Sequence, residues 1–266
     1  MGLSVKSGKP TVGIIGGTGG MGAWFSEIIQ AFASEVFCVG RKTDLTPSEV
    51  AGRCDIVVIS VPVSATVQVI QEIGPQVSKE SLLMDLTSIK AAPLDAMLKY
   101  SEAEVIGVHP LFGPNASSDS DRRVAVCPGR GTRWMPWLSR ALHDTGMKIV
   151  EVSPEKHDHI MGLVQGVNHF ATLALALCIS RSGVSMHDIS NTSTQTFEDR
   201  VHRIQSMLGQ SAGLFGSLIM DNDSADGFIR QYVDAARELA DIAKAGDEAG
   251  FGKIIENLRA YFDDKR

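Results

Sequence analysis

The chain has 266 residues, of which 44% are hydrophobic and 21% charged, and its formal net charge is −6 at pH 7. This apolar content is sufficient for packed cores, so general disorder is excluded, and the length allows one large domain or two small ones. The acidic balance, without a basic block, argues against nucleic acid as a partner. Four scattered cysteines without a CxxC pair argue against a metal site and against a disulfide framework.

The first half of the chain alternates strand patterns with helix patterns. Short runs rich in branched residues predict strands at 11–15, 36–39, 56–60, 82–85, 105–108 and 124–126. Between several of them, helical patterns occur at 20–33, 65–77 and 133–145. This alternation predicts an α/β domain with a Rossmann-type, doubly wound, mostly parallel sheet that carries helices on both faces.

The second half of the chain predicts helices only. Helical patterns cover 155–181, 189–208, 211–221, 225–244 and 247–262. Asp223 or Ser224 is expected to cap the fourth of these helices at its N-terminus, and Gly246 is expected to end it. The sequence therefore divides into a dinucleotide-binding domain, residues 1–152, and an all-helical domain, residues 153–266.

The segment 170–178 is apolar around most of its helical circumference, so it must be buried in a larger assembly. Because about 115 residues leave little room to bury it in one subunit, we predict a homodimer through the helical domain. The longest apolar run, 170–179, is about half of the ~20 residues that span a bilayer, so no membrane contact is expected. The N-terminal residues 1–10 are polar and lack the apolar core of a signal peptide, which favours a cytoplasmic protein.

A glycine-rich loop follows the first predicted strand and opens the first predicted helix. Gly17, Gly19 and Gly22 satisfy G-x-G-x-x-G in the strand–loop–helix context that binds a dinucleotide pyrophosphate. The first glycine is expected to allow the tight turn, the second the approach of the phosphates, and the third close helix–strand packing. The residues expected to contact the cofactor are Gly17, Thr18, Gly19, Gly20, Met21, Gly22, Arg41, Lys42, Val61 and Pro62.

The end of the second strand indicates which dinucleotide is bound. An acidic residue there would accept a hydrogen bond from the ribose 2′-hydroxyl of NAD, but the sequence has Gly40, Arg41 and Lys42, with no carboxylate before Asp44. The positive charge and the guanidinium fork suit a 2′-phosphate, so we predict NADP, with NAD as a possible second cofactor. The alternative is that Arg41 stacks on the adenine ring.

Two further segments, 85–90 and 109–114, follow predicted strands. In open parallel sheets the ligand crevice lies at the carboxyl ends of the strands, so Ser88 and His109 are expected to face the nicotinamide end of the cofactor. A histidine there suits proton transfer, because its unperturbed pKa of ~6.5 lies near working pH. The alternative for His109 is a structural histidine at a strand end.

These segments resemble the prephenate dehydrogenase family, which includes the arogenate dehydrogenases of tyrosine biosynthesis. The resemblance is carried by the glycine loop, 85–90, the H-P-L-F-G-P run at 109–114, 157–159, Gln165, 168–170, 218–220 and 246–247. It implies oxidative decarboxylation of prephenate to 4-hydroxyphenylpyruvate, or of arogenate to tyrosine, with hydride transfer to NAD(P). No fused chorismate mutase or regulatory domain is expected.

The resemblance also implies roles for single residues. His109 would accept the proton of the ring hydroxyl, and Ser88 would orient either His109 or that hydroxyl. Gln165 and His169 lie one turn apart on a helix and would bind the substrate, although His169 alone also fits a core histidine. Where relatives place a carboxylate-binding arginine this chain has Ser206, and Arg203, one turn earlier, is the expected substitute; a solvated surface arginine is the alternative.

Two other functions fit parts of the pattern. A β-hydroxyacid-type dehydrogenase would have a lysine on the interdomain helix, but no lysine occurs between Lys156 and Lys244. A non-enzymatic NADP-binding sensor or dimeric scaffold would need neither His109 nor Ser88. His157 and His159 suggest a metal by composition alone, but no third ligand has suitable spacing, and a solvated helix start is expected instead.

Overall fold

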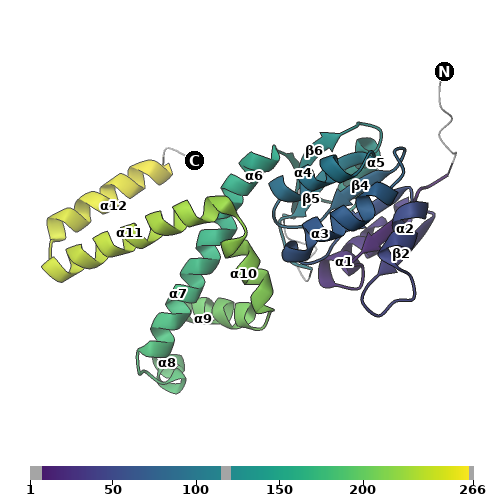
Figure 1. Ribbon diagram of the computed structural model, residues 1–266. Helices are drawn as coiled ribbons and strands as arrows, with labels where there is room; N and C mark the ends of the chain where they lie inside the picture. Colours follow the sequence, from purple (N-terminus) through teal and green to yellow (C-terminus); the bar gives the residue numbers. More distant parts are fainter. Residues whose placement is uncertain (1–7, 115–120, 264–266) are drawn as a thin grey trace.

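The computed structural model describes residues 8–114 and 121–263, so the first residues of the polar N-terminal segment lie outside the described part (Figure 1). Seven strands form one sheet in the order β2-β1-β3-β4-β5-β6-β7. They are β1 (Thr11–Ile15), β2 (Glu35–Val39), β3 (Ile56–Ile59), β4 (Leu82–Asp85), β5 (Glu104–Pro110), β6 (Arg123–Arg130) and β7 (Lys148–Glu151). Only β5 and β6 pair antiparallel, which confirms the predicted mostly parallel Rossmann-type sheet.

Helices cover both faces of the sheet. One core lies under α1 (Gly20–Ile29) and α5 (Met135–Asp144), and the other lies under α2, α3 (Val63–Ile73) and α4. The sequence reasoning missed two of these helices, α2 (Pro47–Arg53) and α4 (Ala91–Tyr100). The first spans only seven residues and is stabilised by a capping box in a polar stretch, whereas the second carries Pro93 in its first turn.

The second half is all-helical, as predicted. A continuous helix runs through α6 (Pro154–Met161), a π-helical turn (Gly162–Val167) and α7 (Asn168–Arg181). It is followed by α8 (Met186–Thr192), α9 (Gln195–Leu208), α10 (Ala212–Met220), α11 (Asp223–Ala245) and α12 (Glu248–Asp263). The predicted single helix at 189–208 is therefore wrong, because extended backbone at Ser193 and Thr194 separates α8 from α9.

The caps of α11 explain where that helix begins and ends. Its N-cap is Asn222, whose side-chain oxygen accepts a hydrogen bond from the backbone N–H of Ser224, so neither Asp223 nor Ser224 caps the helix as expected. Gly246 ends the helix with a left-handed φ of 65°, as predicted.

The π-helical turn lies where α11 crosses the long helix. A Cβ on Gly162 would lie 3.0 Å from the Ser224 side chain, and one on Gly166 would lie 2.8 Å from the Ala225 Cβ. Two glycines four residues apart thus let α11 approach closely, and Ala225 is fully buried at the contact. This crossing places the N-terminus of α11 beside the end of the helix that meets the sheet domain (Figure 1).

Beyond this crossing, α11 and α12 extend away from the long helix (Figure 1). No residue of α7 is buried by its own chain, and large apolar side chains such as Met220 and Phe262 are 76% and 65% exposed. The continuous helix Pro154–Arg181 is long and apolar enough to cross a membrane by length and composition alone, and 17% of its most apolar window is buried. The apolar surface of this domain is therefore expected to be buried against another molecule, because the single chain leaves it exposed.

Candidate active site

The glycine loop joins β1 to α1. Its left-handed residue is Gly16 (φ 89°), one position before the fingerprint glycine expected to make the turn. A Cβ on Gly22 would lie 2.4 Å from the carbonyl oxygen of Gly16, and a Cβ on Gly17 would lie 2.8 Å from the Cβ of Cys38. Gly19 caps α1 without a side-chain hydrogen bond, so the first N–H groups of the helix are left for an outside anion. The loop therefore fits a pyrophosphate.

The ends of β2 and β3 lie beside this loop. A Cβ on Gly40 would lie 2.1 Å from the Thr18 hydroxyl oxygen, which brings the start of the 40–43 turn against the glycine loop. The Gly40 N–H donates to the Thr43 hydroxyl at 3.0 Å, and Arg41 and Lys42 in this turn are exposed. Beyond β3, Val61 follows Ser60 beside Gly16, and Pro62 caps α3. The predicted cofactor residues thus gather at one edge of the sheet.

His109 lies in β5 and is only 3% exposed. Its Nδ1 is 2.9 Å from Nε2 of His157, and its Nε2 is 3.5 Å from the amide nitrogen of Gln165. Burial lowers the pKa of His109 well below its ordinary value of 6.5, and repulsion from His157, when that ring carries a proton on both nitrogens, and from the Lys90 ammonium lowers it further. His109 is therefore neutral at pH 7, as a proton acceptor must be.

The loop after β4 carries Ser88, which is half-buried, toward the same edge of the sheet. Among the described residues no hydrogen bond joins Ser88 to His109. Instead, the loop is fixed by a fully buried ion pair between Asp85 and Lys90, and the Lys90 ammonium also donates to the Val108 carbonyl at 2.9 Å. This pair connects the ends of β4 and β5, so it determines how the loop lies beside the histidine.

The solvated helix start expected at residues 157–159 is wrong for His157, which is 2% exposed. The Nδ1 of His157 lies 2.7 Å from a carboxylate oxygen of Asp158, and that carboxylate also accepts the backbone N–H groups of Lys90 and Ala91, each at 2.8 Å. His159 is exposed and lies against Phe228. The sequence reasoning missed His157 and Asp158 because their partners lie 48 to 68 residues away along the chain.

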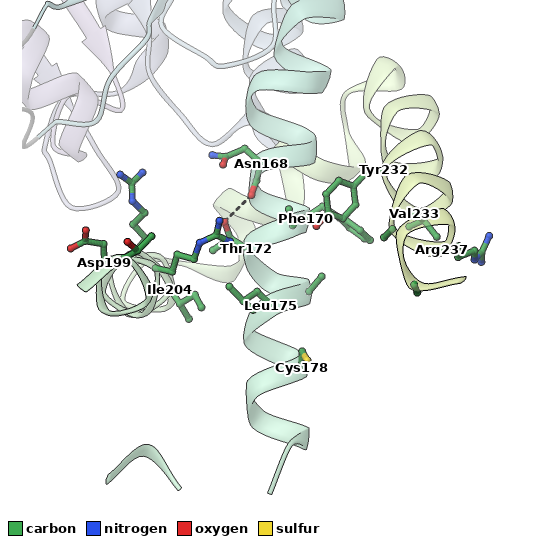
Figure 2. Close-up of a pocket in the computed structure, with 17 residues that line it drawn as sticks. Asn168, Phe170, Thr172, Leu175, Cys178, Asp199, Ile204, Tyr232, Val233 and Arg237 are labelled. Carbon is green, nitrogen blue, oxygen red and sulfur yellow. Dashed lines mark hydrogen bonds between the residues drawn. The ribbon is translucent and has the colours of Figure 1, made fainter. Parts of the chain in front are cut away.

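The predicted substrate residues lie farther along the long helix and on α9. Gln165 occupies the π-helical turn, and His169 lies edge-on to Phe215 with a pKa lowered by partial burial. Arg203 lies on α9 and, together with Arg200 and Asn168, lines a groove of about 930 Å³ between α7, α9 and α11 (Figure 2). Gln165 contacts His109, whereas no contact joins Arg203 to His109 among the described residues.

Comparison with known families gives two matches that together cover most of the chain. Residues 33–151 match "Prephenate dehydrogenase, nucleotide-binding domain", and residues 153–257 match "Prephenate dehydrogenase, dimerization domain". A probable arogenate/prephenate dehydrogenase of Methanocaldococcus jannaschii is 31% identical over 97% of this chain and 62% of its own length. The T-protein of Haemophilus influenzae is 27% identical over 98% of this chain and 69% of its own length. The chain thus spans about two thirds of these relatives.

Solved structures share the fold. A prephenate dehydrogenase from A. aeolicus, in complex with hydroxyphenyl propionate and NAD+, superposes with a TM-score of 0.77 at 16% identity, covering 98% of this chain and all of that one. An arogenate dehydrogenase from Synechocystis superposes with a TM-score of 0.68 at 14% identity, covering 96% of this chain and all of that one. The likeness extends across both halves of the chain.

Proposed function

We propose, since this chain belongs to the prephenate dehydrogenase family, that it catalyses the NAD(P)-linked oxidative decarboxylation of prephenate or arogenate in the cytoplasm. The observation that carries the proposal is a buried, neutral His109 at the edge of the sheet where the glycine loop forms a pyrophosphate cradle. A bound nicotinamide would supply the hydride acceptor. The proposed reaction needs no metal.

The chain's own residues handle the proton. His109 accepts the proton of the ring hydroxyl, so that the ring carbon becomes a carbonyl as its hydride leaves. Loss of the ring carboxylate as carbon dioxide then returns an electron pair to that oxygen, the ring becomes aromatic, and His109 gives the proton back. Because no hydrogen bond joins Ser88 to His109 among the described residues, we assign Ser88 to the substrate hydroxyl.

The substrate carboxylates need donors. Gln165, 3.5 Å from His109, and His169, one turn farther along the helix, are the donors on the long helix. Arg203 supplies positive charge from α9, where it lines the groove beside α7. We keep Arg203 as the carboxylate ligand of this chain in place of the arginine that relatives have at the position of Ser206.

The direct test offers prephenate and arogenate separately, each with NADP and with NAD, and follows reduced nicotinamide and carbon dioxide. We expect both products to form together with at least one substrate. Absence of turnover in all four mixtures, with cofactor binding intact in a fluorescence titration, would contradict the proposed reaction and favour an NADP-binding sensor.

We further propose NADP as the preferred cofactor, on the grounds that Arg41 and Lys42 follow β2 where no carboxylate precedes Asp44. Replacement Arg41→Ala should lower kcat/KM for NADP roughly tenfold, because a charge-assisted contact to the 2′-phosphate is lost. The kcat/KM for NAD, which lacks that phosphate, serves as the control and should stay within about twofold. An equal loss with both cofactors would mean that Arg41 stacks on adenine.

We propose that the apolar surface of the helical domain is buried in a homodimer interface. The match to a dimerization domain over residues 153–257, and an α7 with no buried residue, support this assembly. The first turns of the same long helix carry His157 and Asp158 into contacts with the sheet domain, which favours a protein partner over a bilayer for the remainder.

Sedimentation equilibrium without detergent should therefore give twice the chain mass of 28.5 kDa at micromolar concentration. The double replacement Leu177→Glu with Leu258→Glu, at apolar positions that are 50% and 49% exposed, should shift the protein to monomer. Arg140→Glu, on the sheet domain, is the matched control and should leave the dimer intact. A wild-type monomer at these concentrations would contradict the assembly.

A further inference from the structure

We propose that His157 and Asp158 are positioning residues that fix the tautomer of His109, so that Nε2 of His109 carries the lone pair that accepts the substrate proton. This inference rests on the proposed function and names part of its machinery. The observation behind it is an unbroken line of short contacts, Asp158–His157–His109, in which both rings are buried.

The hydrogen-bond network assigns each proton in this line. A carboxylate accepts only, so the ring nitrogen facing Asp158, Nδ1 of His157, carries hydrogen. In a neutral ring the other nitrogen, Nε2 of His157, is then an acceptor, and it lies 2.9 Å from Nδ1 of His109. Nδ1 of His109 must therefore donate, which leaves Nε2 of His109 without hydrogen. The amide nitrogen of Gln165, a donor, faces that same Nε2 at 3.5 Å.

Asp158 is fixed by several hydrogen bonds, so it can set the direction of the hydrogen bonds from His109 to His157. Its two carboxylate oxygens accept the backbone N–H groups of Lys90 and Ala91, each at 2.8 Å, and its carbonyl accepts the side-chain amide of Asn222 at 2.8 Å. Asn222 is in turn the N-cap of α11. The carboxylate thus joins the loop that carries Ser88 to the helical domain, and the direction of its hydrogen bonds is set by fixed backbone donors.

The line of contacts also provides a second acceptor, His157, for the positive charge that proton transfer brings to His109. When Nε2 of His109 takes the hydroxyl proton, the hydrogen on Nδ1 can move to Nε2 of His157, and the positive charge then lies beside the Asp158 carboxylate. This matters because burial and the Lys90 ammonium oppose a charge on His109 itself. The other charged or titratable groups nearby are Asp85, which is paired with Lys90, and Cys127, whose thiol pKa burial raises to about 12.

Steady-state kinetics with the protein's own substrate test the role of the line. His157→Phe should lower kcat about 10²–10⁴-fold, with KM changed less than about threefold, because the ring that accepts from Nδ1 is lost. His157→Gln should recover at least tenfold of that loss, since the amide oxygen can accept the same hydrogen bond. His159→Phe, two residues along on the exposed side of the same helix, is the matched control and should behave as wild type.

A second measurement needs no turnover. In the full-length protein with ¹⁵N-labelled histidine rings, long-range ¹⁵N–¹H correlation should report the Nδ1–H tautomer for both His109 and His157. Asp158→Ala removes the carboxylate that keeps hydrogen on Nδ1 of His157, so the Nε2–H tautomer should appear in both rings. If wild type turns over no substrate, the proposed reaction fails while these spectra still decide the tautomer.

Three results would overturn the inference. They are an Nε2–H tautomer of His109 in the wild-type protein, spectra unchanged by Asp158→Ala in folded protein, and wild-type kcat in His157→Phe. A rise in KM alone, or equal losses of kcat in His157→Gln and His157→Phe, would also contradict it, because His157 would then act by packing alone.

Discussion

Replacement of His109 by asparagine should lower kcat about 10²–10⁴-fold, because the ring hydroxyl then loses its proton acceptor in the transition state. Asparagine can still hydrogen-bond to His157, so the variant should fold as wild type does. The dissociation constant of the nicotinamide cofactor should stay within about twofold of the wild-type value. Stopped-flow absorbance of reduced nicotinamide, paired with a fluorescence titration of the cofactor, measures both quantities. Near-wild-type turnover would mean that another group accepts the proton.

The pH dependence of the same reaction has a defined sign. Only neutral His109 can accept a proton, and burial, His157 and Lys90 all lower its pKa from the ordinary 6.5. The kcat/KM should therefore hold its plateau as the pH falls through 6.5 and decline only at more acidic values. An acid limb centred at or above 6.5 would show that His109 is not shielded in this way. In His109→Asn this limb should disappear from the residual activity.

The sheet domain followed from the sequence because its signals are local. Each strand is a short run of branched residues, and the glycine loop lies between strand and helix in the chain itself. The two missed helices carry weaker local signals, because α2 spans seven residues and is held by a capping box, and α4 has Pro93 in its first turn. Helix boundaries differed from the prediction where a side-chain cap sets the first residue, as at Asn222.

Only part of the candidate site could be predicted, because only part of it has local signals in the sequence. His109 lies near the end of β5 and Ser88 follows β4, so the topology alone brings them to the crevice edge. His157 looked like part of a solvated helix start, because nothing near it in sequence indicates burial against a histidine 48 residues away. The exposed α7 is the converse case, since its apolar circumference indicated a partner that one chain does not contain.

Lys90 is the second residue whose replacement should have a large effect, in this case on folding. It lies two residues beyond Ser88 and is fully buried, with its ammonium on Asp85 and on the Val108 carbonyl. Its stem crosses β5 at Gly107, where a Cβ would lie 3.3 Å from the lysine side chain. One oxygen of Asp85 already lacks a partner among the described residues, so the carboxylate depends on Lys90 for its compensation.

Lys90→Met should therefore lower the free energy of unfolding by about 3–5 kcal/mol, because it leaves a buried carboxylate without its counter-charge while keeping the stem. Adding Asp85→Asn removes that charge, and the double variant should regain more than half of the loss. Urea denaturation followed by circular dichroism measures wild type and both variants, at one protein concentration so that any contribution from subunit association stays the same. The exposed pair Arg140–Asp144 supplies the control, since Arg140→Met should change the free energy by less than about 1 kcal/mol. If the double variant were as unstable as Lys90→Met alone, the loss would come from packing and the Val108 contact, and the ion pair would have no special part in fixing the loop beside His109.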